Sequence, residues 1–216
     1  FIVSTEEGST YEGGAVILAV GVKHRMLGLE GEQELIGKGI SFCAVCDGDF
    51  YTGRRVCVAG GGNSALQEAL LLAETSKSVT VIQNLPQFTG EKKLADALME
   101  RPNVEVLFST LVSGYITENG ALTGLTLRTE KGIEELVCDR VVLAIGQGPS
   151  SALSEEAQIA TTLRGLFVVD ENGMTNIPGV FAAGDVVSGP KTVVEAVAHT
   201  KKVAERMVKY CYENKN

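Results

Sequence analysis

The stretch Val56-Cys57-Val58-Ala59-Gly60-Gly61-Gly62-Asn63-Ser64-Ala65 is the strongest indication of the fold. It has the pattern of an apolar strand, a glycine loop and the start of a helix. Glycines there permit a tight turn and the close approach of a pyrophosphate, whose charge the helix N-terminus stabilises. The pattern Gly60-x-Gly62-x-x-Ala65 is weak by itself, and the alternative is a loop that only packs the helix on the strand. Its place between a strand and a helix favours a dinucleotide site.

Strands and helices alternate around this loop. Apolar periodicity predicts strands at 55–59, 78–82 and 104–108 and helices at 63–75 and 91–101. This is a βαβαβ unit of about fifty residues, the size of a mononucleotide-binding half. The period then becomes two, which predicts a three-stranded meander through 115–117, 122–128 and 134–137. A buried strand follows at 141–146.

The segments on either side of this block contain fewer elements. The pattern predicts strands at 16–21, 166–169 and 180–185, a connector at 25–39 and a long amphipathic helix at 192–211. We expect these flanks to belong together. The predicted fold class is α/β: a three-layer Rossmann-like dinucleotide-binding domain with a β-meander, plus a partial second domain of the same type.

A C-x-x-C pair stands just before this unit, in Cys43-Ala44-Val45-Cys46-Asp47-Gly48. Two thiols at this spacing can close a small disulfide, and an adjacent acid can supply or remove a proton during exchange. The alternatives are half of a zinc site or two core thiols. Zinc needs four ligands, and the sequence has no second C-x-x-C. We therefore expect a redox dithiol and no metal site. A redox dithiol beside a dinucleotide site implies that electrons pass from a soluble carrier to a disulfide.

Composition narrows the function further. The chain has 216 residues, a net charge of −8 and five cysteines without a framework spacing. The acidic balance argues against a nucleic-acid partner, and the apolar runs are too short to span a membrane. The cysteine usage favours a reducing, cytoplasmic setting. The first residues read as a strand already in progress, so we expect the chain to be part of a larger protein.

Two further positions bear on ligands. The end of the second strand normally carries the residue that separates NAD from NADP, but Gln83-Asn84-Leu85 offers neither an acid nor an arginine. The nucleotide preference therefore cannot be read there. Gly184-Asp185 is suited either to accept hydrogen bonds from polyol hydroxyls or to form an ordinary turn, and the residues alone leave both readings open.

Four motifs, in this order, resemble those of bacterial-type thioredoxin reductases of low molecular weight. They are Phe42–Phe50, the loop Gly60–Ala65, Ala144-Ile145-Gly146 and Ile177–Asp185. Members of that family are FAD enzymes that pass electrons from NADPH through flavin to a C-x-x-C pair and on to thioredoxin. The resemblance covers nearly the whole chain. It implies a C-terminal fragment lacking the first FAD-binding segment, with 1–33 and 147–216 as parts of the FAD-binding domain and 34–146 as the NAD(P)-binding domain.

The resemblance also implies residue roles. Cys46 would face the flavin, Cys43 would attack a thioredoxin-like partner, and Asp47 would move protons. The nicotinamide dinucleotide, NADP or NAD, would be lined by Gly60, Gly62, Asn63, Ser64, Ala65, Ile145 and Gly146. FAD would be contacted by Gly184, Asp185, Thr192 and Val193. The full-length parent would be a homodimer.

Three departures from the family pattern leave the donor open. The first FAD-binding segment is absent. The His-Arg-Arg cluster that reads the 2′-phosphate of NADPH is Gln83-Asn84-Leu85 here, and a later arginine is Thr89. The Arg-Gln-Ala motif near the flavin is Thr192-Val193-Val194, which looks more like flavoproteins of the glutamate synthase small-subunit type. NADPH, NADH and ferredoxin remain as donors, and a non-catalytic dinucleotide-binding fragment remains as the alternative function.

Overall fold

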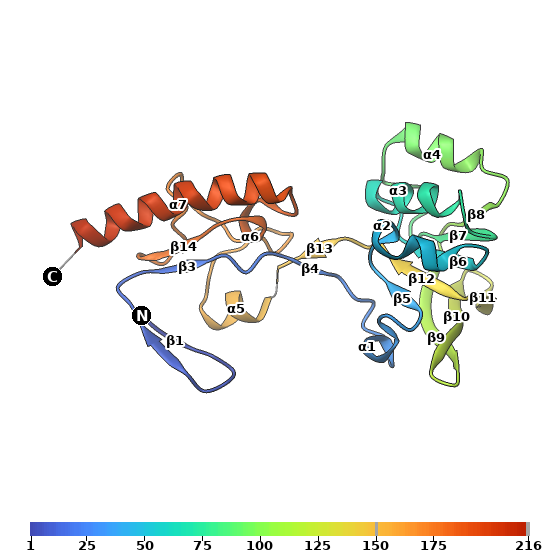
Figure 1. Cartoon of the computed structure of the whole chain (residues 1–216), viewed down its shortest axis with the longest axis horizontal. Helices are drawn as coiled ribbons and strands as arrows, with labels where there is room; N and C mark the ends of the chain where they lie inside the picture. Colours follow the sequence, from blue (N-terminus) through green and yellow to red (C-terminus); the bar gives the residue numbers. More distant parts are fainter. Residues whose placement is uncertain (150, 215–216) are drawn as a thin grey trace. The chain divides into compact units, whose positions relative to one another are not determined.

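The computed structural model describes residues 1–149 and 151–214, which form two compact units (Figure 1). The first unit combines Phe1–Lys23 with Gln147–Asn216, and the second is His24–Gly146. The second unit therefore begins at His24, earlier than the expected residue 34. The reason is that Leu27 and Leu29 pack into its core, which ties the segment before residue 34 to this unit.

A parallel sheet of five strands forms the centre of the second unit, in the order β5-β12-β6-β7-β8. Its strands are β5 (Ile40–Ser41), β6 (Arg55–Ala59), β7 (Ser78–Ile82), β8 (Val104–Leu107) and β12 (Arg140–Leu143). The helices α3 (Asn63–Leu72) and α4 (Lys92–Met99) cover one face (Figure 1). Val56, Val58 and Val79 point into that face and are fully buried against Leu66 and other apolar side chains of α3.

The other face of the sheet carries the meander, made of β9 (Leu111–Glu118), β10 (Ala121–Thr129) and β11 (Gly132–Val137). All three strands pair antiparallel, with β10 in the middle. Leu122, Leu125 and Leu127 of β10 share one buried cluster with Cys57 and Val141 of the sheet. Helices, parallel sheet and meander are the three layers that the sequence predicts, so this part of the fold prediction is confirmed.

The expected connector at 25–39 contains a short helix, α1 (Glu32–Leu35), whose first residue is buried. The Glu32 carboxylate accepts hydrogen bonds from the backbone N–H groups of Leu27 (3.0 Å) and Gly28 (2.8 Å) and from the Tyr115 hydroxyl (2.5 Å). Burial and the neighbouring Glu32 carboxylate raise the pKa of Tyr115. One acidic side chain thus fastens the entry segment to strand β9.

We expect Glu32→Ala to lower the free energy of unfolding by about 2–4 kcal/mol, because it leaves three partly buried donors without an acceptor. Glu34→Ala in the same short helix is the matched control, since Glu34 is exposed and exposed substitutions change stability by roughly 0.5 kcal/mol or less. Chemical denaturation of the two variants decides the point. Equal stability of the two variants would show that Glu32 fastens nothing.

Arg55 and Asp139 form a second long-range tie in this unit. Arg55 donates from Nη2 to Oδ1 (2.8 Å) and from its backbone N–H to Oδ2 (2.9 Å), at the edge where β6 meets β12. The side-chain hydrogen bond from Arg55 lowers the pKa of Asp139 to about 2. A carboxyl group whose pKa is lower in the folded state than in the unfolded state stabilises the fold when it is ionised. For Asp139 this stabilisation is complete above the unfolded-state pKa of about 4 and is lost as the pH falls towards about 2.

Asp139→Asn should therefore cost about 1 kcal/mol at neutral pH, a value discounted for the exposure of Arg55. The difference from the wild-type protein should shrink as the pH falls from about 4 through about 2. Asp96→Asn removes a carboxylate from an exposed pair with Lys92 and serves as the control, with no expected change at either pH. A penalty for Asp139→Asn that is independent of pH would contradict this account.

The first unit is built around a two-stranded parallel ladder of β3 (Val16–Leu18) and β14 (Val180–Ala182). Phe167, Ala182 and Val186 form one buried cluster of this unit, and Phe181 with Val203 belongs to another. An antiparallel hairpin precedes the ladder. The remaining elements are β1 (Ile2–Ser4), β2 (Thr10–Glu12), β4 (Lys23–His24), β13 (Gln147–Gly148), α5 (Ser151–Glu156), α6 (Asp185–Ser188) and α7 (Val193–Glu213).

The expected strand at 166–169 is wrong. Phe167 is buried, but the segment makes only an isolated bridge between Thr161 and Phe167. The apolar run exists because Phe167 and Val169 pack into the core of this unit, while Phe167 N–H donates to the carbonyl of Val186 in α6 and not to a neighbouring strand.

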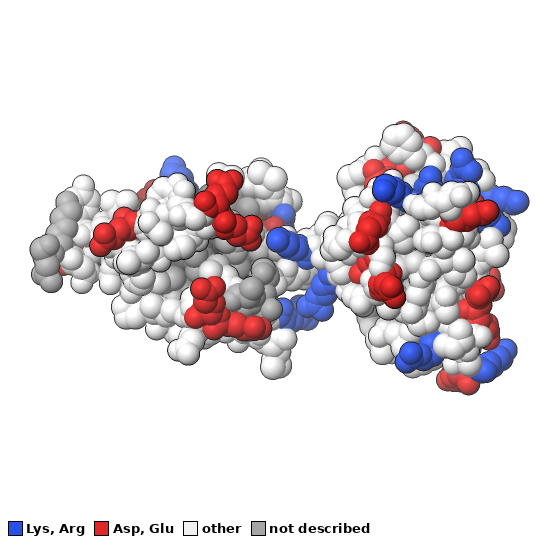
Figure 2. Space-filling view, turned by 90° about the horizontal axis from the view of Figure 1, so that it is seen from below, with Lys and Arg blue, Asp and Glu red and all other residues white. Residues whose placement is uncertain are grey.

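Charged side chains of both signs are interspersed on the face of each unit that Figure 2 shows. Within residues 1–149 and 151–214, no helix combines the length and the apolar character needed to cross a membrane.

Candidate functional site

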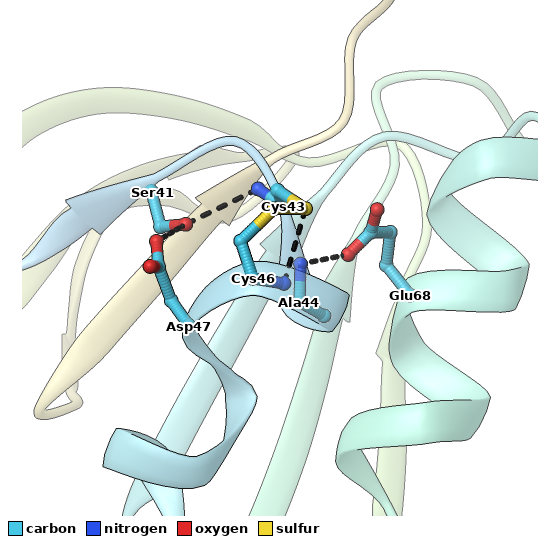
Figure 3. The surroundings of a disulfide bond; sticks show 6 residues. All are labelled: Ser41, Cys43, Ala44, Cys46, Asp47 and Glu68. Carbon is cyan, nitrogen blue, oxygen red and sulfur yellow. Dashed lines mark hydrogen bonds between the residues drawn. A yellow bond between two sulfur atoms is a disulfide. The ribbon is translucent and has the colours of Figure 1, made fainter.

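The cysteine pair lies at the end of the edge strand β5. The chain leaves β5 at Ser41 and enters the short helix α2 (Ala44–Asp47), for which Cys43 is the N-cap residue. Cys43 and Cys46 are joined by a disulfide, with their Cα atoms 5.3 Å apart (Figure 3). The Cys46 N–H donates to Cys43 Sγ at 3.1 Å. Cys43 is half-buried and Cys46 is exposed, so the bond can be reached from outside the unit.

Ser41 links the two ends of this loop. Its buried hydroxyl accepts a hydrogen bond from the backbone N–H of Cys43 (3.1 Å) and donates one to Asp47 Oδ2 (2.6 Å). Tyr51 of η1 (Gly48–Tyr51) is hydrogen-bonded to Ser41 as well, and burial raises the pKa of its hydroxyl. The carboxylate of Asp47 is therefore held in a fixed position beside the cysteine pair.

Glu68 reaches the pair from the opposite side (Figure 3). It belongs to α3, and its Oε2 accepts a hydrogen bond from the backbone N–H of Ala44. Burial raises the pKa of this half-buried carboxyl, while the bond from Ala44 and the charge of His24 oppose the shift. Neither Ser41 nor Glu68 is among the site residues that the sequence predicts. Glu68 does carry a signal in the sequence. It is a charged residue three positions after Ala65, on the apolar side of the predicted helix, where a charge indicates a specific partner.

The glycine loop opens onto a cavity of about 480 Å³ within the second unit. Six of the predicted dinucleotide residues line it: Gly60, Gly62, Asn63, Ser64, Ile145 and Gly146. The seventh, Ala65, lies beneath the loop and is fully buried, 3.3 Å from where a Cβ on Gly60 would stand. The structure therefore gathers these residues at the carboxyl ends of β6 and β12, where ligands of parallel sheets bind.

The loop conformation depends on its glycines to different degrees. Gly60 has φ +128°, and a Cβ there would lie 2.4 Å from the carbonyl oxygen of Ala144. A Cβ on Gly61 would meet the buried side chain of Gln83 at 2.5 Å. Gly62 has ordinary extended dihedrals (φ −86°, ψ 179°), and the nearest atom to its Cβ would be Thr89 Oγ1 at 3.8 Å. Space beside Gly62 is thus left open on the cavity side.

Gln83, Asn84, Leu85 and Thr89 line the part of the cavity beside β7, and none of them carries a charge. Gln83 is 3% exposed, and its amide donates to the carbonyl of Gln87 at 3.1 Å. Thr89 is tied to the glycine loop, because its N–H donates to the Gly61 carbonyl at 2.8 Å. Gln83 and Thr89 thus support the shape of the loop, and none of the four side chains brings a cation to the cavity.

The four predicted flavin residues belong to the first unit, at the starts of two helices. Gly184 is the N-cap residue of α6, with φ +75°, and its N–H donates to Nδ1 of His199 at 3.1 Å. Asp185 Oδ1 is buried without a hydrogen-bond partner. Thr192 caps α7 in a capping box with Glu195, and Val193 is exposed beside it. Among the described residues, no cluster of three or more His, Cys, Asp or Glu side chains is suited to hold a metal ion.

Comparison with known proteins agrees with this geometry. Residues 1–200 match the family model described as pyridine nucleotide-disulphide oxidoreductase. The chain is 38% identical to the thioredoxin reductase of Rickettsia prowazekii over 86% of its own length and 61% of that protein. It is 34% identical to the thioredoxin reductase of Listeria monocytogenes over its whole length and 68% of that protein.

A solved structure extends the comparison to the fold. The thioredoxin reductase of Lactococcus lactis matches 98% of the chain and 70% of its own, with a TM-score of 0.80 and 26% identity. The chain thus spans roughly two thirds of the length of these relatives. It belongs to the pyridine nucleotide-disulphide oxidoreductase family, within the group of the thioredoxin reductases.

Proposed function

We propose that the chain is the part of a flavoprotein disulfide oxidoreductase that receives electrons at Cys43–Cys46 and passes them to a thioredoxin-like protein. The observation that carries this proposal is the packing of α2 against α3. The redox disulfide and the glycine-loop cavity thereby share one helix, which begins at the cavity and contacts the disulfide loop through Glu68. A module that only binds a dinucleotide has no use for an accessible disulfide at this place.

The cavity fits a nicotinamide dinucleotide. A Cβ on Gly60 would collide with the Ala144 carbonyl and one on Gly61 with the Gln83 side chain, so glycine keeps this turn tight, and α3 begins there without a side-chain cap. The first N–H groups of a helix and its dipole stabilise a pyrophosphate. Asn63 and Ser64, both exposed at this helix start, would lie beside the phosphates.

Gly184 and Asp185 fit a polyol chain such as that of FAD. The buried Oδ1 of Asp185 has no partner, which is costly unless a ligand hydroxyl donates to it. Members of this family use FAD and NADPH, and bound flavin would supply the step between hydride donor and disulfide. Thr192 and Val193 at the start of α7 would lie near it under this proposal, and residues 147–216 with the first strands would form part of the FAD-binding domain.

The residues of the second unit then take the following roles. Cys43 attacks the disulfide of the partner, Cys46 closes the pair again, and Asp47 accepts or donates the proton that each sulfur loses or gains. Ser41 keeps the carboxylate of Asp47 oriented through its 2.6 Å hydrogen bond. Val45 and Phe50, which are 81% and 76% exposed, offer apolar contact area to the partner beside the disulfide.

The proposal also covers the electron donor, the oligomeric state and the cellular location of the parent enzyme. The uncharged side chains at the end of β7 favour a parent enzyme that does not depend on a 2′-phosphate, with NADH or a protein donor such as ferredoxin as the alternatives to NADPH. We also propose a homodimer for the parent and a cytoplasmic location. The location rests on five cysteines without a framework spacing.

Trapping a mixed disulfide tests the proposed exchange. The Cys46→Ser chain is mixed with a thioredoxin that keeps one active-site cysteine, activated as an aromatic disulfide. The Cys43 thiolate should displace the aromatic thiol and form a covalent adduct, which a reductant releases. The Cys43→Ser chain is the control. An adduct through Cys46 and none through Cys43 would overturn the assigned roles, and no adduct through either would overturn the function.

A further inference from the structure

Two consecutive backbone N–H groups at the start of α2 are connected to carboxylates, one through a serine hydroxyl and one directly (Figure 3). The N–H of Cys43 donates to Ser41, which in turn holds Asp47. The N–H of Ala44 donates to Glu68 on the other side of the disulfide. Asp47 already has a role in the proposed exchange, whereas Glu68 has none. Its carboxylate is half-buried, and it comes from an element 24 residues away in sequence.

This arrangement bears on the charge that Cys43 can carry after reduction. Free N–H groups at a helix start normally stabilise a cysteine thiolate, which lowers the thiol pKa. Here the N–H of Ala44, adjacent to Cys43 in the chain, is taken by a carboxylate, and Cys43 Sγ receives only the N–H of Cys46 at 3.1 Å. Because it accepts the N–H of Ala44, the residue next to Cys43, the Glu68 carboxylate brings a negative charge to this end of the disulfide loop, and like charges disfavour ionisation.

We propose that Glu68 is a positioning residue that anchors α2 on α3 and whose negative charge disfavours the Cys43 thiolate, which shifts the pair toward the disulfide. The inference rests on the proposed function for the use of this shift. A pair held toward the disulfide form is a stronger reductant once it is reduced, as a donor to a partner disulfide must be.

The charge balance of the step sets when the effect appears. A reducing dithiol breaks the Sγ–Sγ bond of Cys43–Cys46 and is itself oxidised to a disulfide, so two electrons pass to the two cysteines. Each sulfur takes a proton at low pH and remains a thiolate at high pH. Glu68 opposes only the thiolate, so its influence grows as the pH rises. The titratable groups that interact with Glu68 are His24 and Tyr51, and Tyr51 in turn interacts with Asp47 and Arg140; all four stay unchanged in the test.

The alkylation rate of Cys43, followed against pH in the reduced chain and resolved by mass spectrometry, tests this. Glu68→Gln keeps an acceptor for the Ala44 N–H and removes only the charge. We expect its Cys43 profile to move to lower pH. We also expect its equilibrium with dithiothreitol at alkaline pH to favour the dithiol by roughly threefold to tenfold over wild type. Glu74→Gln, which removes an exposed charge just past the end of α3, is the control and should change nothing.

Glu68→Ala, which removes both the charge and the acceptor, separates the two parts of the role. If Glu68→Gln behaves as wild type while Glu68→Ala does not, Glu68 is an anchor only and the proposal is wrong. If neither variant differs from wild type, it is also wrong. Cys211 is a free cysteine outside this unit. Its alkylation rate should be the same in all variants and serves as the internal standard for the reagent. The measurement uses neither thioredoxin nor a nicotinamide donor, so failure of the proposed function would leave its reading intact.

Discussion

Gly62→Asp should weaken nicotinamide dinucleotide binding by about a hundredfold or more, that is, by about 3 kcal/mol or more, while the protein stays folded. Gly62 is the N-cap residue of α3 and has extended dihedrals that aspartate adopts readily. Aspartate is a preferred N-cap residue, so stability should hold or rise by up to about 1 kcal/mol. The same carboxylate would take the N–H groups that a pyrophosphate needs, and its charge would repel the phosphates.

Calorimetric titration of the chain with NADH, together with chemical denaturation, measures both halves of this prediction. Gly62→Ala is the matched control, because its Cβ would have 3.8 Å of clearance from Thr89 and would leave the helix N–H groups free. It should bind more tightly than Gly62→Asp. Gly60→Ala should instead unfold or distort the loop, since its Cβ would meet the Ala144 carbonyl at 2.4 Å. Undiminished binding by Gly62→Asp would place the pyrophosphate elsewhere.

NADPH and NADH should bind this chain with affinities that differ by about tenfold or less, that is, by about 1.4 kcal/mol. An arginine fork holds a ribose 2′-phosphate by bidentate, charge-assisted hydrogen bonds. The cavity beside β7 presents Gln83, Asn84 and Leu85 instead, and the amide of Gln83 is already bonded to Gln87. A 2′-phosphate would lose hydration there without gaining a cation.

The complementary variant makes this prediction sharper. Asn84 and Leu85 are exposed at the cavity, so Asn84→Arg with Leu85→Arg should raise NADPH affinity about tenfold and leave NADH unchanged. The same two positions changed to glutamine control for side-chain length. A wild-type preference for NADPH above about a hundredfold, near 3 kcal/mol, would show that another part of the protein reads the 2′-phosphate. If both nucleotides bind poorly, a protein donor such as ferredoxin gains support.

The local parts of this fold could be predicted from the sequence. Strand, glycine loop and helix at 55–72 are contiguous, and each element has its own pattern of apolar residues. The meander could also be predicted, because its strands alternate and follow one another along the chain. Six of the expected dinucleotide residues share one cavity for the same reason: they come from strand ends of a single sheet.

The contacts that could not be predicted join distant segments. Glu32 stands in a stretch rich in glycine and glutamate that resembles a solvated connector, and its partner Tyr115 lies 83 residues away. Glu68 meets Ala44 only because α2 folds back on α3. The run at 166–169 failed for a related reason: its burial comes from the core around Phe167, and apolar composition alone does not reveal whether a buried segment has a neighbouring strand.

The function proposed for this chain requires that Cys43–Cys46 be a redox-active disulfide that exchanges electrons with a thioredoxin-like protein. Counting thiols in the unfolded chain, before and after incubation with excess reduced thioredoxin, tests it most directly. Cys57, Cys138 and Cys211 are free and the pair is bonded, so the count should rise from three to all five cysteines, with the gain at Cys43 and Cys46. The Cys43→Ser, Cys46→Ser double variant should show no gain. A wild-type count that stays at three would contradict the account.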